Sequence, residues 1–66
     1  MTELREHRAM GRTYEIIIGG IAYPGQCRTV EMSKDGRYIA VCKYFNTGNP
    51  DATFRVEVDG LGNEVE

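Results

Sequence analysis

From residue 12 onward, apolar and polar side chains alternate with a period of two, which is typical of β-strands. Four segments show the pattern, at residues 14–23, 26–33, 37–45 and 53–59. They are rich in β-branched and aromatic residues, and turn-forming residues separate them. The pattern predicts a mainly β fold, in which a single antiparallel sheet of four to five strands forms a meander or a small, partly closed barrel.

Residues 1–11 lack this alternation and are treated as a segment of their own, ahead of an antiparallel β domain at residues 12–66. Two interpretations stay open for it. It is a polar leader, or it is a short helix with Thr2 as N-cap and Gly11 just past its end. A helix this short, with few apolar residues, would need to dock on the sheet to be stable.

Two glycine-containing pairs interrupt the first apolar stretch. Gly19-Gly20 is either a bulge that bends one long strand or a primed turn that makes a hairpin. We favour the bend, because Tyr23 follows too soon after the glycines for a full second strand. Pro24-Gly25 has the residue order of a type II turn and is predicted to end the strand.

Asp35-Gly36 is the strongest hairpin signal in the chain. A two-residue loop would pair Met32 with Ile39, and a three-residue loop with a glycine bulge would pair Met32 with Tyr38. Because side chains alternate between faces, the two registers place different residues in the core.

The chain has two cysteines, Cys27 and Cys42. The two-residue loop puts them diagonally on one face, and the three-residue loop puts them on opposite faces. Neither places them directly opposite, and diagonal neighbours about 7–8 Å apart are too distant for easy bridging. We therefore expect two free thiols.

The last two strand segments differ in how many apolar faces they have. In residues 53–59 the apolar Phe54, Val56 and Val58 alternate strictly with polar residues, which indicates one wet face. Residues 37–45 carry bulk on both faces and are expected to form a central strand. The second face would be covered by the N-terminal segment, by barrel closure, by a second copy or by another partner.

Composition limits the protein to one small domain. At 66 residues, with 41% hydrophobic and 27% charged positions, the chain is long enough to fold but buries a thin core. No apolar run approaches a membrane span, and the charged N-terminus is not a signal peptide. We expect a cytoplasmic location.

The net charge of −2 argues against a general polyanion binder. The charge is also uneven. Residues 1–43 hold seven basic and five acidic groups, whereas residues 44–66 hold one basic and five acidic groups. The acidic part is interpreted as a solvated edge strand and tail, with an acidic docking face as the alternative.

No equipment for catalysis is recognisable. The single histidine, His7, lies in the least patterned segment and is expected at the surface. Two cysteines and one histidine are too few for a zinc site, and the glycines do not follow phosphate-loop spacing. We therefore expect no enzyme activity, no metal and no cofactor.

One nine-residue segment resembles a hairpin of a known protein family. Residues 33–41, Ser-Lys-Asp-Gly-Arg-Tyr-Ile-Ala-Val, resemble the hairpin of a β-propeller blade. The motif does not recur, and a propeller needs several copies. The resemblance implies shared turn chemistry and no propeller function.

The favoured functional hypothesis is a non-enzymatic protein-binding module. Tyr and Arg are the residue types that dominate interface hot spots, and acidic residues would imitate nucleic-acid charge. The candidate partner-binding residues are Tyr38, Tyr44, Asp51, Arg55, Glu57 and Asp59. In size and composition the chain resembles the small inhibitors of host defence that phages and mobile elements carry, such as anti-CRISPR proteins. That resemblance implies inhibition by covering a surface.

Two alternatives remain. In the first, a small barrel binds nucleic acid, with tyrosines stacking on bases and Arg28, Arg37 and Lys43 contacting phosphates. In the second, an exposed apolar face or edge joins two copies in a structural homodimer.

Overall fold

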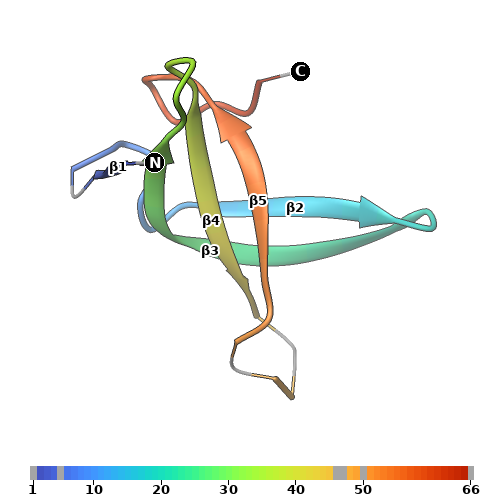
Figure 1. Ribbon diagram of the computed structural model, residues 1–66. Coiled ribbons are helices and arrows are strands. Elements are labelled where there is room, and N and C mark those ends of the chain that lie inside the picture. The colour runs from blue at the N-terminus through green and yellow to red at the C-terminus, as the bar shows by residue number, and fades with distance from the viewer. Residues whose placement is uncertain (1, 5, 46–47, 50, 66) are drawn as a thin grey trace.

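The structure is a computed structural model that describes residues 2–4, 6–45, 48–49 and 51–65. One curled antiparallel sheet makes up the fold (Figure 1). Its five strands are β1 (Thr2–Leu4), β2 (Thr13–Ile18), β3 (Ile21–Met32), β4 (Tyr38–Tyr44) and β5 (Thr53–Val58). The predicted mainly β fold is confirmed. Positions 1 and 5 of the predicted N-terminal segment, positions 46, 47 and 50 between the last two predicted strands, and Glu66 of the acidic tail lie outside the described residues.

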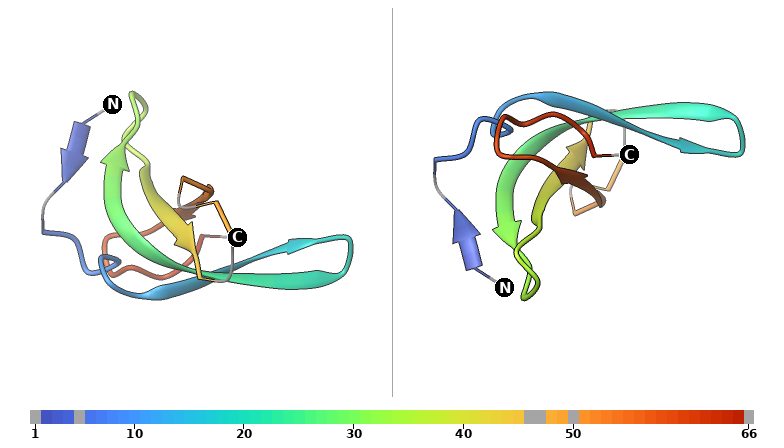
Figure 2. Two further views of the ribbon diagram at one scale, coloured as in Figure 1. Left: turned by 90° about the horizontal axis from the view of Figure 1, so that it is seen from below. Right: turned by 90° about the horizontal axis from the view of Figure 1, so that it is seen from above.

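The long strand β3 organises the sheet. It is 12 residues long and pairs with β4 along one edge at residues 25–32, while β2 and β1 share the other edge, β2 at residues 21–26 and β1 at residues 30–32. β4 lies between β3 and β5, so the prediction of a central strand with a neighbour on each side is confirmed. Figure 2 shows the sheet curling into a half-barrel from which the β2–β3 hairpin projects.

The N-terminal helix is not formed. Among the described residues none is helical, and Thr2–Leu4 instead forms β1 against β3. Next to it, His7 and the following residues make a turn in which Met10 N donates to His7 O at 3.0 Å. His7 is half-buried, in contrast to the expected surface position, because its Nδ1 accepts from Ala9 N at 3.0 Å and its ring lies 4.8 Å from the Tyr38 ring.

The favoured bend at Gly19-Gly20 is wrong. Ile18 pairs directly with Ile21, and both glycines have positive φ, of 59° and 81°. Positive φ at both loop positions defines a type I′ turn, whose twist matches that of the paired strands. The expected strand end near Tyr23 is missing because β3 runs on for nine more residues, to Met32.

The predicted turn at Pro24-Gly25 is also wrong, since both residues lie inside β3. Pro24 O accepts from Phe45 N at 3.2 Å, so the side of Pro24 that lacks an N–H faces the point where β4 ends. A proline at such an edge costs no ladder hydrogen bond. Gly25 is needed there for a different reason: a Cβ atom would lie 2.5 Å from Phe54 Cε1 and 2.8 Å from Lys43 O.

The β3–β4 turn uses the three-residue loop. Met32 pairs with Tyr38, and Gly36 has a φ of 84°, as a glycine-bulge loop requires. Asp35 stabilises the loop by accepting from the Ser33 hydroxyl, which also lowers the pKa of Asp35.

The relative positions of Cys27 and Cys42 do not follow from the register of the β3–β4 turn alone. A bulge between Cys27 and Thr29 inserts one extra residue, Arg28, into β3 and shifts the face of everything before it. Cys27 consequently pairs with Cys42 on the same face, directly opposite it. The expectation that no register places them opposite is therefore wrong, while the expectation of free thiols is confirmed.

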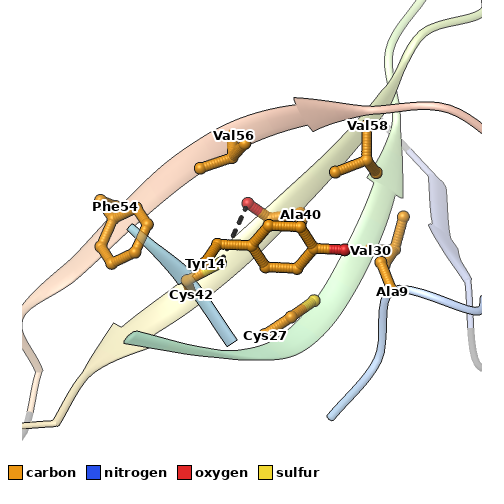
Figure 3. Close-up of a cluster of buried hydrophobic side chains, with 9 residues drawn as sticks. All are labelled: Ala9, Tyr14, Cys27, Val30, Ala40, Cys42, Phe54, Val56 and Val58. Carbon is orange, nitrogen blue, oxygen red and sulfur yellow. Dashed lines mark hydrogen bonds between the residues drawn. The ribbon is translucent and has the colours of Figure 1, made fainter. Parts of the chain in front are cut away.

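The concave side of the half-barrel holds the core, which we call the core face (Figure 3). The buried residues are Ala9, Tyr14, Cys27, Val30, Ala40, Cys42, Phe54, Val56 and Val58. They include the three apolar residues predicted for the last strand. The core is closed by the Tyr14 hydroxyl, which donates to Gly62 O in the C-terminal turn.

The other side of the sheet, the outer face, is covered by charged side chains. Ile39 and Val41 of β4 are half-buried there. Arg55 Nε lies 3.6 Å from Glu31 Oε1, and these two residues pair with Val41 and Ile39 respectively, so their ion pair crosses β4 diagonally. On the question of what covers this face, the structure shows one ion pair lying across it, with the Glu31 Oε1 atom buried and the Arg55 side chain 62% exposed.

The free edge of β5 is partly covered by the chain's own C-terminal segment. Asp59 N donates to Asn63 O at 2.8 Å and Val65 N donates to Glu57 O at 2.9 Å. Val58 and Glu64 form an isolated bridge between these bonds. The end of β5, at Glu57 and Val58, is therefore paired on both sides.

Candidate functional site

The predicted tyrosines lie on the core face and are occupied by intramolecular contacts. Tyr38 packs on the His7 ring, and the Tyr44 ring lies 4.8 Å from Phe54 and 6.4 Å from Tyr23. Both Tyr38 and Tyr44 are half-buried. Both side chains pack against the edge of the hydrophobic core.

The predicted Arg55 and Glu57 lie on the opposite, outer face. Arg55 pairs with Glu31, and Glu57 Oε1 lies 3.7 Å from Arg37 Nη1. Exposed ion pairs of this kind contribute little to stability, about 0–1 kcal/mol each. Of the described acidic residues that would form an acidic docking face, these ion pairs engage one, Glu57.

The two predicted aspartates lie at opposite ends of β5, a six-residue strand about 20 Å long. Asp51 is exposed before the strand, and its N–H donates to Asn49 Oδ1. Asp59 has a structural role after the strand, because its carboxylate accepts from the N–H groups of Asn63 and Leu61. These hydrogen bonds lower the pKa of Asp59.

The six predicted residues are therefore divided between two faces and two ends of the sheet. The same division affects the nucleic-acid alternative. The tyrosines lie on the core face, whereas Lys43 pairs with Thr53 on the outer face and Arg37 is engaged by Asp35 at 3.1 Å and by Glu57. A groove that combines stacking rings with free cations is not assembled from these side chains.

Cys27 and Cys42 form a buried thiol pair in the core. Cys27 donates to Thr29 O at 3.2 Å, and Cys42 is directly across from it. Burial raises the pKa of both thiols, that of Cys42 to about 12. Since the thiolate is the reactive form, these cysteines are poor nucleophiles at neutral pH.

A different surface stands out on the β2–β3 hairpin. We call residues 13–24 the hairpin arm; Figure 2 shows it projecting from the half-barrel. Its large apolar side chains are exposed to solvent: Ile17 is 64% exposed, Ile18 53%, Ile21 58% and Tyr23 39%. Contiguous exposed apolar surface of this kind marks interaction sites on soluble proteins.

The core face of the arm continues the core itself. Ile16 pairs with Tyr23 and Ile18 pairs with Ile21, so all four side chains lie on that face. Ile16 packs against the core, and the Tyr23 ring meets Tyr44 edge-on. The apolar surface therefore extends without a break from the buried core to the tip of the arm.

The arm is apolar on its outer face as well. Ile17 pairs with Ala22 there, and Glu15 pairs with Pro24. Glu15 is the one charged residue among the arm's twelve positions, although 27% of the chain is charged. Nothing in the described part of the chain covers either face near the tip, where every residue from 17 to 24 is exposed.

The sequence analysis did not identify this surface because it favoured a bend at Gly19-Gly20, which makes residues 14–23 one strand rather than a hairpin. The signal that would have found it is Gly19-Gly20, taken as a primed turn. A two-residue turn makes a hairpin of two apolar strands, and an isolated two-stranded hairpin leaves apolar side chains exposed unless another element packs on it.

Two searches of the described residues bear on other classes of site. They contain no group of three or more His, Cys, Asp or Glu side chains that could hold a metal ion. No helix long and apolar enough to cross a membrane occurs among them.

No protein-family model matches the chain, and no curated protein or solved structure matches it either.

Proposed function

We propose that this protein is a small, non-enzymatic protein-binding module whose contact surface is the hairpin arm. The observation that carries the proposal is the exposure of Ile17, Ile18, Ile21 and Tyr23 on a structured hairpin. Burying apolar area of this kind is the main driving force of protein association. An aromatic residue beside aliphatic ones is also the composition of an interface core.

The shape of the arm suits a blocking role. A projecting hairpin reaches into a concavity or lies across a surface of a larger protein, while the half-barrel behind it holds the arm in place. An inhibitor that covers a functional surface, the class that the chain resembles in size and acidity, would act in this way.

The experiment is site-specific photo-cross-linking in the native cell. A benzophenone side chain is placed at Ile17 on the arm or, as a matched control, at Lys34 in the β3–β4 turn; both positions are exposed. We expect a discrete cross-linked protein from position 17 and not from position 34. Equal cross-linking at both positions, or none at position 17, would contradict the proposal.

A further inference from the structure

The backbone of β2 has an unpaired edge. Pro24 directs its carbonyl toward Phe45 on the β4 side, so Glu15, its partner across the hairpin, makes no ladder bond with it. The N–H and C=O of Glu15 therefore point away from β3. By alternation those of Thr13 and Ile17 do the same, and no strand among the described residues pairs with this edge.

This edge lacks the usual protection against pairing. Natural edge strands are blunted by lysine, proline, bulges or a covering segment. Residues 14–18, Tyr-Glu-Ile-Ile-Ile, contain none of the first three, and only Glu15 is charged. The contrast within the molecule is clear, because the C-terminal segment covers the edge of β5 through Val65 and Asn63.

We infer that the edge of β2 pairs with β2 of a second copy, in an antiparallel arrangement related by a two-fold axis; this inference rests on the proposed function of the arm. An antiparallel strand pairs with itself by symmetry, so one edge supplies both halves of the interface. Such pairing joins the two sheets into one. It also lays Ile17 and Ile18 of each arm, both more than half exposed in the single chain, along β2 of the other copy.

The charge of Glu15 and the end of β2 at Ile18 determine where the two-fold axis lies. An axis at Glu15 would place this carboxylate opposite its own copy, and like charges directly opposite are unfavourable. An axis at Ile17 would pair Glu15 with Gly19 in the turn, where the strand has ended. An axis at Ile16 avoids both problems. It pairs Ile16 with Ile16 and Tyr14 with Ile18 on the core face.

Sedimentation over a concentration series from 10 µM to 1 mM tests the inference with two proline variants. Ile17→Pro removes an N–H from the free edge of β2. Ala22→Pro is the matched control, because Ala22 pairs with Ile17 and presents its N–H to the other edge of the arm. We expect a wild-type dimer, a loss of at least tenfold in the association constant for Ile17→Pro, and little change for Ala22→Pro. A wild-type monomer at 1 mM, or a dimer that survives Ile17→Pro, would overturn the inference.

A second measurement does not depend on the folding of the proline variants. Ile16→Cys places two thiols opposite each other on the axis, whereas Glu15→Cys faces Ile17 of the other copy. A mild disulfide oxidant, which takes two electrons and two protons from the thiol pair, should cross-link only the first variant. Absence of that cross-link overturns the self-pairing. The proposed function is judged separately, since cross-linking from Ile17 to a different protein, with a monomeric wild type, supports the module and rejects the dimer.

Discussion

The Tyr14 hydroxyl donates a hydrogen bond to the carbonyl oxygen of Gly62, 48 residues later in the chain. This bond joins β2 to the C-terminal turn across the open side of the half-barrel. Gly62 approaches so closely that a Cβ atom there would lie 3.0 Å from Ala9 N. The base of the hairpin arm is thereby fixed to the last turn of the fold.

Replacing Tyr14 with Phe should lower the free energy of unfolding by about 1–3 kcal/mol, because the buried Gly62 carbonyl loses its partner while the ring packing stays. Urea unfolding followed by circular dichroism measures the change. Tyr23→Phe is the control, since the Tyr23 hydroxyl makes no hydrogen bond with a described residue, and it should change the free energy by less than about 0.5 kcal/mol. Equal losses in the two variants would contradict a structural role for the bond.

Replacing Gly25 with Ala should destabilise the protein by about 1–3 kcal/mol, as overpacking of a filled core does. The added methyl group would meet the Phe54 ring and the Lys43 carbonyl. Gly60→Ala is the matched control, because a Cβ atom at Gly60 has no heavy atom within 4 Å. Thermal unfolding of both variants checks the expectation, and similar melting temperatures would show that Gly25 is not held by Phe54.

Much of the sheet could be predicted from the sequence. The strict alternation of residues 53–59 and the double-sided bulk of residues 37–45 fix strand type and order, because each pattern fits one burial environment. The observed pairing of Met32 with Tyr38 was also one of the two registers predicted from Asp35-Gly36. These features depend on local spacing alone.

The bulge at Arg28 was not predictable in the same way. No glycine or proline marks it, and it is required only because both Cys27 and Val30 must reach the core face. A bulge inside a strand is decided by tertiary packing, which a period-two pattern cannot show. The direct pairing of Cys27 with Cys42 follows from it and was missed for that reason.

The candidate site was missed because the sequence shows which residues are apolar and not which are covered. Ile16, Ile17 and Ile18 look like core residues, yet two of the three are more than half exposed. Coverage depends on where β3 leaves the half-barrel. That in turn depends on the Gly19-Gly20 turn and on Pro24 standing beyond the end of β4.

The buried thiols should make the protein less stable in alkali. Cys42 releases its proton at a pKa of about 12 in the fold, against an ordinary value of 9.0. Between these values the unfolded chain has lost the proton and the folded chain keeps it. The free energy of unfolding is therefore constant below pH 9 with respect to this group and falls above it, by up to about 1.4 kcal/mol per pH unit for each thiol.

Urea unfolding at pH values from 7 to 11 measures this slope, and Cys42→Ala provides the comparison. The variant should be less stable at pH 7 because of the small cavity, but its stability should fall less steeply above pH 9. Identical slopes would mean that the Cys42 thiol is not buried from solvent.

The turn at the tip of the hairpin arm should accept asparagine. Gly19 has a φ of 59°, within the left-handed region that Asn tolerates best among residues with a side chain, and a Cβ atom there meets nothing within 4 Å. Asn-Gly is also the preferred pair for a type I′ turn. Gly19→Asn should therefore raise the free energy of unfolding by about 0.4–1 kcal/mol by restricting the unfolded chain.

Gly19→Val is the contrasting variant, because a β-branched residue at positive φ is strained, and it should destabilise the arm. Amide hydrogen exchange of Ile18 and Ile21 measures both effects at the tip. We expect slower exchange in the Asn variant and faster exchange in the Val variant. The reverse order would contradict a type I′ turn at Gly19-Gly20 and favour the bent strand.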